Sequence, residues 1–289
     1  MLDKIVSSLN LKPGHTVLDA TIGGGGHAIE ILDRIKPGGK LIGLDADASA
    51  VSRARGALGD SAALCILVNE NFRNLDSVFE REGIKKIDAC LFDVGISSFQ
   101  MDDADRGFSF QRDARLDMRM DPGLRISAWD IVNKYREEDL SDIIYNYGEE
   151  RFARRVARYI VNSRAEKPID TTGELRSIVH RAVRGRRGRI DPATRTFQAL
   201  RIAVNDELGA LDEGLKKAID RLSEGGRIAV ISFHSLEDRI VKNIFKSCAA
   251  SGILKIITRK PITASEEEKA VNPRSRSAKL RIAERVGAL

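Results

Sequence analysis

Three aspartates end three short apolar stretches of the chain. Asp19 ends VLD, Asp45 ends KLIGLD and Asp93 ends IDACLFD. If these stretches are parallel strands, their carboxyl ends meet at the edge of the sheet where ligands of open α/β proteins bind. Three carboxylates that converge on one crevice suit a ligand with cationic and hydroxyl groups.

A run of four glycines, residues 23–26, follows the first of these stretches and precedes an amphipathic helical pattern. Glycine lets the backbone turn sharply and lets a ligand approach it closely, and the next helix begins with its positive end toward the crevice. Four glycines in a row also carry a large cost in chain entropy, which calls for a reason. We therefore predict a ligand site at this turn.

Two nucleotide ligands fit the turn. Gly23, Gly25 and Ala28 match the G-x-G-x-x-A fingerprint of dinucleotide-binding proteins. Asp19 argues against a dinucleotide, because a carboxylate beside the turn repels a pyrophosphate and attracts the ammonium and sulfonium of S-adenosylmethionine. Asp45 lies 22 residues after Gly23, where an acidic side chain can hold the ribose hydroxyls of an adenosine moiety. We favour S-adenosylmethionine and keep an NAD-dependent oxidoreductase as the alternative.

Further candidates lie after the third and fifth apolar stretches. Phe72 is placed to stack on an adenine, or it belongs to a satellite of the core. The run SFHSLEDRIVK puts His234 and Ser235 at the same edge as the aspartates. His234 either acts in the crevice or caps the following helix, and the sequence leaves both open.

Positive charge is concentrated in one region. The chain has 289 residues and a net charge of +6, but residues 151–201 contain thirteen Arg and one Lys against four acids, so this segment is +10 and the rest is −4. Such a cluster is typical of a footprint on a phosphate backbone. The arginines of RGRRGR, residues 184–189, and Arg274, Arg276 and Lys279 are candidate phosphate contacts.

The composition, 42% hydrophobic and 31% charged, is that of an ordinary soluble domain. No apolar run reaches 18 residues and the first ten residues lack a signal-peptide core, so we expect a cytoplasmic protein without a membrane segment. The three cysteines are isolated from one another, and we predict no metal site.

The order of elements predicts a doubly wound α/β sheet. Short, continuously apolar strands alternate with helical patterns, as in parallel sheets covered on both faces. We expect parallel strands at residues 16–19, 40–45, 63–68, 87–94 and 227–233, and an antiparallel pair at residues 253–258 and 279–286.

The alternation stops after Asp93. Residues 95–123 are expected to form a long loop, and helical patterns follow, the last of them a single helix from about 194 to 222. We therefore predict a donor-binding domain made of residues 1–104 and 206–289, interrupted by an all-helical, RNA-binding insertion at residues 105–205.

Several long runs resemble the MraW family of ribosomal RNA methyltransferases. They include VLDATIGGGGH, DVGISSFQMDDADRGFSF, PATRTFQALRIAVNDEL, SFHSLEDRIVK and NPRSRSAKLRIAER, and the match extends over nearly the whole chain. The resemblance implies a class I (Rossmann-like) S-adenosylmethionine-dependent methyltransferase sheet with a helical insertion. It also implies N4-methylation of a cytidine in the decoding region of 16S ribosomal RNA, with a small-subunit particle as the partner.

The family's donor-binding positions transfer to this sequence one by one. They are Gly25, Gly26, His27, Asp45, Phe72, Asp93 and Gln100. His27 and Gln100 come from the resemblance alone, whereas the others also stand out in the sequence itself.

During methylation of an exocyclic amine the nitrogen gains positive charge and then gives up a proton. A nearby group is needed to stabilise this charge and to accept the proton. Asp93, a backbone carbonyl of the turn at residues 95–98, and Ser235 together with His234 are the candidates, and Asp93 and His234 are our predicted catalytic residues. A non-catalytic RNA-binding assembly factor is the alternative function, favoured if RNA binds but no methyl group is transferred.

Overall fold

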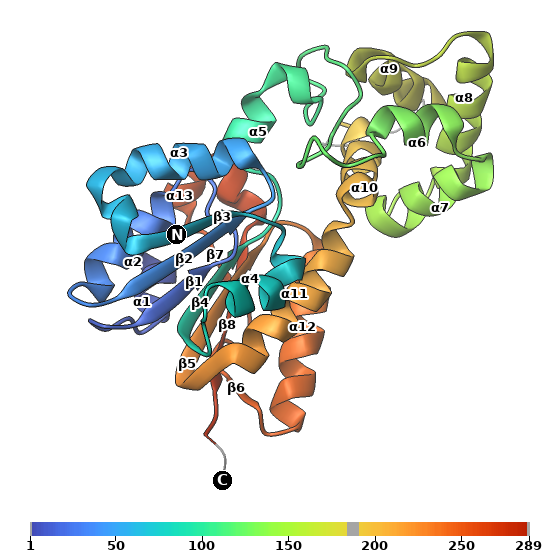
Figure 1. Cartoon of the computed structure of the whole chain (residues 1–289). Coiled ribbons are helices and arrows are strands. Elements are labelled where there is room, and N and C mark those ends of the chain that lie inside the picture. Colours follow the sequence, from blue (N-terminus) through green and yellow to red (C-terminus); the bar gives the residue numbers. More distant parts are fainter. Residues whose placement is uncertain (1, 184–190, 288–289) are drawn as a thin grey trace. The chain divides into compact units, whose positions relative to one another are not determined.

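The computed structural model describes residues 2–183 and 191–287, and the chain divides into two compact units (Figure 1). The sheet unit contains Met1–Gly95 and Leu208–Leu289, and the helical unit contains Ile96–Glu207. The helical unit thus begins earlier than the predicted 105, because Ile96 already packs against the helical core. The predicted RGRRGR contacts, residues 184–189, lie outside the described residues.

The sheet unit contains an eight-stranded sheet with the order β3-β2-β1-β4-β5-β8-β6, and β7 pairs with β8. The first five strands in this order are parallel, whereas β8 runs antiparallel to β5, β6 and β7. This topology confirms the predicted Rossmann-like class. The strands are β1 (Thr16–Asp19), β2 (Lys40–Asp45), β3 (Cys65–Asn69), β4 (Ile87–Asp93), β5 (Leu222–Ser232), β6 (Leu254–Ile256), β7 (Ile262–Thr263) and β8 (Lys279–Arg285).

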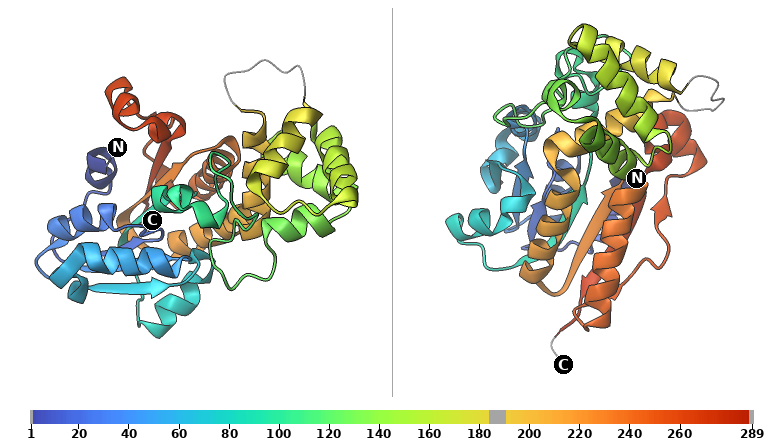
Figure 2. Two further views of the ribbon diagram at one scale, coloured as in Figure 1. Left: turned by 90° about the horizontal axis from the view of Figure 1, so that it is seen from above. Right: turned by 90° about the vertical axis from the view of Figure 1, so that its right-hand side faces the viewer.

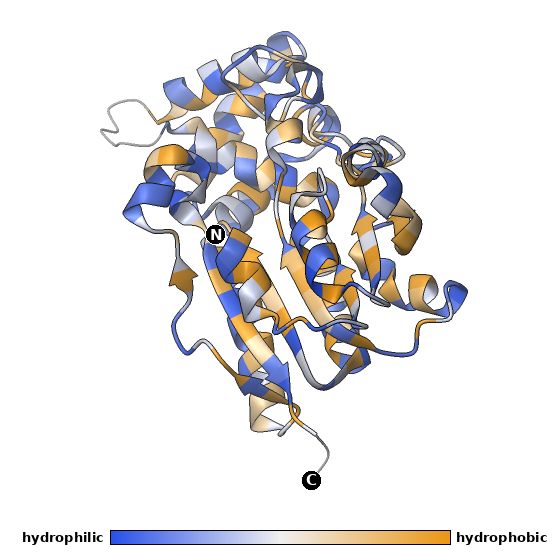
Figure 3. Ribbon diagram, turned by 90° about the vertical axis from the view of Figure 1, so that its left-hand side faces the viewer, coloured by the Kyte–Doolittle hydropathy of each residue, from blue (hydrophilic) through white to orange (hydrophobic). Residues whose placement is uncertain are grey.

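Helices cover both faces of this sheet (Figure 2). On one face, α4 (Leu75–Arg81), α11 (Glu207–Arg221) and α12 (Ser235–Ala250) bury side chains against the strands. On the other face, α1 (Leu2–Ser8), α2 (Gly26–Ile35) and α3 (Ala48–Leu58) do the same. The strands are therefore largely hydrophobic along their length (Figure 3), as burial on both faces requires.

The helical unit has a hydrophobic core of its own, which includes Leu140, Val156, Ile160 and Leu200. Its helices are α5 (Ser98–Asp102), α6 (Ala128–Lys134), α7 (Glu137–Gly148), α8 (Ala153–Glu166), α9 (Thr172–Ala182) and α10 (Ala193–Asn205). The single helix predicted from 194 to 222 is wrong. Asp206 adopts a left-handed conformation, with φ 45°, which ends α10 before α11 begins.

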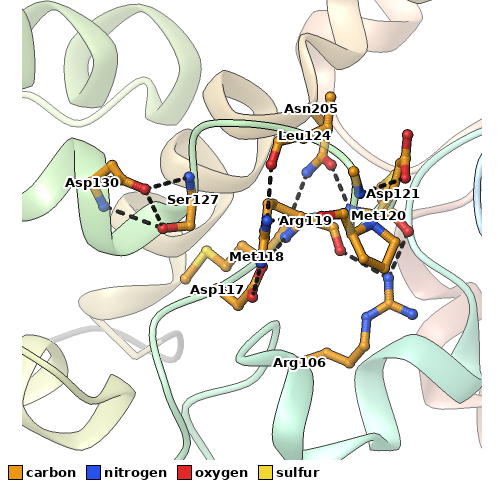
Figure 4. Close-up of polar contacts among 12 residues, drawn as sticks. Arg106, Asp117, Met118, Arg119, Met120, Asp121, Leu124, Ser127, Asp130 and Asn205 are labelled. Carbon is orange, nitrogen blue, oxygen red and sulfur yellow. Dashed lines mark hydrogen bonds and ion pairs between the residues drawn. The ribbon is translucent and has the colours of Figure 1, made fainter.

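The predicted loop at residues 95–123 contains the short helix α5 and a 3₁₀ helix at Ala104–Arg106, and side-chain contacts hold part of the remainder (Figure 4). The Arg106 guanidinium donates to the carbonyls of Arg119 and Met120 at 2.8 and 2.7 Å. The Asn205 side chain donates from Nδ2 to the Met118 carbonyl at 2.8 Å, and its Oδ1 accepts from the Met120 backbone amide at 2.7 Å. These bonds satisfy backbone groups that no helix or strand pairs.

Other strand boundaries also differ from the predictions, and β5 begins at Leu222 rather than at 227. β3 begins at Cys65 rather than at 63, because Gly59–Leu64 form a 3₁₀ helix. The antiparallel pairing of the last predicted strands is confirmed in β6 and β8, while β7 and α13 (Glu266–Val271) were not predicted. No helix among residues 2–183 and 191–287 is long and apolar enough to cross a membrane.

Candidate active site

The carboxyl edge of the parallel strands brings the three predicted aspartates together. In the sheet register, Asp19 pairs with Gly43 of β2 on one side and with Leu91 of β4 on the other. Asp45 and Asp93 therefore each lie two residues beyond the partner of Asp19, on the two strands that flank it. The sheet unit thus presents three carboxylates along one edge, as the sequence predicted.

The glycine turn beside them requires its glycines. Gly23 and Gly25 have φ values of 52° and 86°, which favour glycine. A Cβ on Gly25 would also lie 3.3 Å from the Cα of Ala54. Gly25 caps α2 without a side chain, so the positive end of α2 is left for a ligand. A Cβ on Gly26 would meet nothing within 4 Å, which leaves open space at the start of the helix.

Asp45 connects β2 to the glycine turn. Its Oδ2 accepts from the Gly23 amide at 3.0 Å and its Oδ1 accepts from the Asp47 amide at 2.9 Å. Burial raises the pKa of Asp45. Asp47, and not Asp45, caps α3, through a 2.9 Å bond from the Ser49 amide. Asp45 is therefore free of the helix-capping role and stays a predicted ribose ligand.

Asp19 is completely buried, which changes the argument that the sequence suggested for it. Its Oδ1 accepts from the Thr21 amide at 3.2 Å, and its Oδ2 has no hydrogen-bond partner within the described residues. Burial raises the pKa of Asp19 to about 7. Because Asp19 then titrates near neutrality, its charge alone does not separate a dinucleotide from a sulfonium ligand.

Asp93 lies half-buried at the end of β4 with one free oxygen. Its amide donates to the Thr21 hydroxyl at 2.7 Å, while its Oδ1 has no hydrogen-bond partner in the described part of the chain. Burial and, secondarily, the charge of Glu237 raise the pKa of Asp93 to about 7. An unpaired carboxylate oxygen with such a pKa is suited to hold a cation or to accept a proton near neutral pH.

His27 lies near Asp93 without forming an ion pair. Its Nδ1 is 3.8 Å from Oδ2 of Asp93, which is too long for a hydrogen bond. Burial lowers the pKa of His27 to about 4, so the imidazole is neutral at pH 7. His27 therefore contributes a neutral polar ring to the edge that holds Asp93.

The structure gives His234 the capping role that the sequence left open. His234 is the N-cap of α12, and its Nδ1 accepts from the Glu237 amide at 3.4 Å. With Nδ1 as the acceptor, a neutral imidazole carries its proton on Nε2, which lies 3.0 Å from Oε1 of Glu237. Nδ1 is therefore engaged in the cap, whereas Nε2 has no hydrogen-bond partner within the described residues, and a catalytic role of His234 stays a prediction.

Glu237 is a residue that the sequence analysis missed. Its side chain is buried, and its Oε2 accepts from the amides of Phe233 and His234 at 2.7 and 3.2 Å. It thereby fixes the turn after β5 and places a negative charge near Asp93. The spacing His-x-x-Glu in SFHSLED is that of a capping box and would have revealed it.

Phe72 packs on the core of the sheet unit. Its ring meets Phe92 edge to face at a centroid distance of 5.4 Å. A Cβ on Gly214 of α11 would lie 2.6 Å from the Phe72 ring, so the glycine makes room for it. The structure therefore supports the satellite-core interpretation, and contact of Phe72 with adenine stays a prediction.

Gln100 belongs to the helical unit rather than to the sheet unit. It is buried in α5, where its Oε1 accepts from the Ser97 amide at 3.0 Å and the Ser97 hydroxyl accepts from its own amide at 3.2 Å. This capping box explains the residue locally. Its contact with a donor stays a prediction.

The candidate phosphate contacts before β8 differ in their surroundings. Arg274 and Arg276 are exposed. Lys279 lies 3.5 Å from the Asp238 carboxylate, which also accepts from the buried Arg281 at 2.7 Å. The Lys279 charge is therefore partly compensated within the protein.

Comparison with known proteins identifies the family to which this protein belongs. The model of the MraW methylase family matches residues 1–286. The chain belongs to this family. Ribosomal RNA small subunit methyltransferase H of Clostridioides difficile (strain 630) is 47% identical, over 99% of this chain and 97% of the relative. The proteins of that name from Heliobacterium mobile and Dehalococcoides mccartyi are each 48% identical over 99% of this chain, and over 97% and 85% of their own lengths.

Family membership confirms the resemblance inferred from the sequence runs. The family is one of methylases, so the oxidoreductase alternative falls.

Proposed function

We propose that this protein transfers a methyl group from S-adenosylmethionine to N4 of a cytidine in the decoding region of 16S ribosomal RNA, within a small-subunit particle. The observation that carries the proposal is the Asp93 carboxylate. It keeps one oxygen unpaired at the strand edge, beside an uncapped helix, in a chain of a methylase family. The names of the relatives support ribosomal RNA as the substrate.

The residues at the edge fit S-adenosylmethionine. Each oxygen of Asp45 accepts one backbone bond and retains a second lone pair for a ribose hydroxyl. The turn at Gly25 and Gly26 provides close backbone approach, and the half-buried Asp93 carboxylate suits the donor's cationic groups. When bound, this donor supplies an electrophilic methyl group on a sulfonium sulfur.

Asp93 is the acceptor that we favour for the cytosine amine. The exocyclic nitrogen is a weak nucleophile because its lone pair is delocalised into the ring, and it gains positive charge as the new nitrogen–carbon bond forms. The Asp93 carboxylate can stabilise that charge and take the proton that the nitrogen releases. We assign His234 and Glu237 to positioning, because both are engaged in the cap of α12.

Alignment of the reacting atoms supplies most of the acceleration in this proposal. Holding two reactants in line can contribute about 7 to 11 kcal/mol. The target cytidine must be unpaired or flipped out of a helix to present its amine to Asp93.

Methyl transfer from tritiated S-adenosylmethionine tests the function. Small ribosomal subunits from a strain that lacks the activity serve as the substrate. After the reaction, the RNA is digested and its nucleosides are analysed. We expect label in 4-methylcytidine. Binding of these particles without incorporation of label would instead establish a non-catalytic assembly factor.

Changing all three cysteines to alanine should leave methyl transfer intact. Methylation at carbon 5 of cytosine requires a thiolate, but Cys90 is completely buried and burial raises its pKa well above the usual value. Burial also raises the pKa of Cys65 and Cys248. Loss of turnover in a folded, donor-binding Cys90→Ala variant, or 5-methylcytidine in the product, would contradict transfer to the amine.

Asp45→Ala should weaken donor binding about tenfold to a hundredfold. The change removes charge-assisted hydrogen bonding to the ribose, which is worth about 1.5 to 3 kcal/mol in total. Isothermal titration of S-adenosylmethionine measures the effect.

Asp47→Ala is the matched control for Asp45→Ala, since it lies in the same turn. It removes the cap of α3 at a cost of about 1 kcal/mol in stability. Donor affinity should change little. If both variants lose affinity equally, Asp45 acts through the turn and does not bind the ribose.

A further inference from the structure

Four exposed arginines form a stripe at the beginning of α8. They are Arg151, Arg154, Arg155 and Arg158, which we call the α8 arginine face. Arg154, Arg155 and Arg158 lie on the exposed side of α8, while the opposite side is buried in the core of the helical unit, and Arg151 lies in the turn just before the helix. The four exposed guanidinium groups thus gather at one end of α8.

Helix stability does not explain this arrangement. Arg154 and Arg155 occupy the first turn of α8, which contains no acidic residue. The positive end of the helix dipole disfavours cations there by about 0.3 to 1 kcal/mol each. Arginines at this end cost stability, which points to an anion outside the protein.

Internal ion pairing does not explain it either. Within the described part of the chain, no acidic side chain lies within ion-pair distance of Arg151, Arg154 or Arg155. Only Arg158 approaches an acid, with its Nε 3.6 Å from Glu137. Arg164, farther along α8, differs from these four, because its guanidinium donates to the Val132 carbonyl inside the unit.

Aromatic rings hold two of these guanidinium groups. Arg151 lies over the ring of Phe152 at 4.7 Å and Arg155 over the ring of Tyr159 at 5.8 Å. Such stacking restrains the side chain while its donors stay available. A guanidinium held in this way loses less entropy when it donates two hydrogen bonds to a phosphate.

We propose that the α8 arginine face binds the sugar-phosphate backbone of the RNA substrate. The inference rests on the proposed function, in which RNA is the substrate. It adds the surface of the helical unit that binds the RNA backbone. The unpaired charges, their position at the disfavoured end of the helix and the stacked guanidiniums support it. Contacts of this kind set affinity and position without reading sequence.

Changing the four arginines to glutamine tests the proposal. The probe is a fluorescein-labelled 16S RNA fragment spanning the decoding region, and anisotropy gives its Kd at several KCl concentrations. The Kd measured in ~0.1 M KCl should rise about 10- to 100-fold in this variant. The slope of log K against log salt should flatten by about 0.7 to 0.9 for each phosphate that the variant no longer neutralises. The affinity for S-adenosylmethionine should stay unchanged.

Two matched variants control for folding and for net charge. Arg→Lys at the same four positions keeps the charge and should keep the salt slope. Glutamine at Arg81, Lys85, Lys216 and Lys246 removes four exposed charges from the sheet unit and should have a small effect. If this second variant weakens RNA binding as much as the first, net charge accounts for the effect and the proposal is overturned.

Methyl transfer separates this proposal from the proposed function. The glutamine variant of α8 should raise KM for the RNA at least about tenfold and keep kcat at saturating RNA. If the wild-type protein methylates RNA but the variant matches it in slope and KM, only the α8 proposal fails. If the wild-type protein neither binds nor methylates RNA, the proposed function itself fails.

Discussion

Asp93→Asn should lower kcat for methyl transfer by about 10²- to 10⁴-fold, the range over which positioned acids and bases contribute. Asparagine has nearly the same shape and retains a carbonyl oxygen, but it accepts no proton. The backbone bond from Asp93 to Thr21 does not involve the changed atoms and should persist. Single-turnover transfer to small subunits measures the effect. A kcat within about threefold of wild type would move the acceptor role to a backbone carbonyl or to Ser235.

The rate should also depend on pH through the same carboxyl. Asp93 accepts a proton only when ionised, and burial raises its pKa to about 7. The rate should therefore rise as pH increases through about 7 and then level off. Asp93→Asn should abolish this inflection, whereas a change that affects only folding would lower the rate at all pH values.

Glu237→Gln provides the reciprocal test, because the charge of Glu237 is the second cause of the raised pKa of Asp93. Glutamine keeps an oxygen to accept from the amides of Phe233 and His234, but it loses the charge and the oxygen that faces Nε2 of His234. The inflection should move to lower pH. An unmoved inflection would show that burial alone sets the pKa.

The sequence was sufficient to predict the sheet and its edge because both depend on local patterns. Continuous apolar runs mark strands covered on two faces, and β1, β2 and β4 end at the aspartates that close those runs. The left-handed residue that separates α10 from α11 gave no such signal. Asp206 lies in a helical pattern that continues on both sides, and only the tertiary structure places the break there.

The ionisation of the site could not be predicted in the same way. A raised pKa depends on how deeply the group is buried. The sequence around Asp19 and Asp93 does not distinguish them from exposed aspartates that end a strand, so it could not predict their raised pKa values. The sequence treated Asp19 as an anion, whereas burial makes it a carboxyl that titrates near neutrality. The capping function of His234 was open to prediction, since Glu237 follows it at the spacing of a capping box.

Asp19→Asn should stabilise the protein at pH 8 and leave its stability nearly unchanged at pH 4. The pKa of Asp19 is about 7 when folded and about 3.9 when unfolded, so the folded state binds the proton more tightly. The stability that Asp19 contributes is therefore complete below pH 3.9 and is lost as pH rises through about 7. The loss amounts to about 4 kcal/mol, and asparagine escapes it because it carries no charge.

Urea unfolding of the variant and of wild type at both pH values measures this difference. Asparagine retains an oxygen to accept from the Thr21 amide, so the turn after β1 should be preserved. Asp33→Asn, at an exposed position on α2, is the control and should show little difference between the two pH values. An equal change in stability at pH 4 and pH 8 would mean that packing, not charge, dominates at Asp19. A gain confined to high pH, together with weaker S-adenosylmethionine binding, would show that the buried carboxylate is kept for a cationic ligand at the expense of stability.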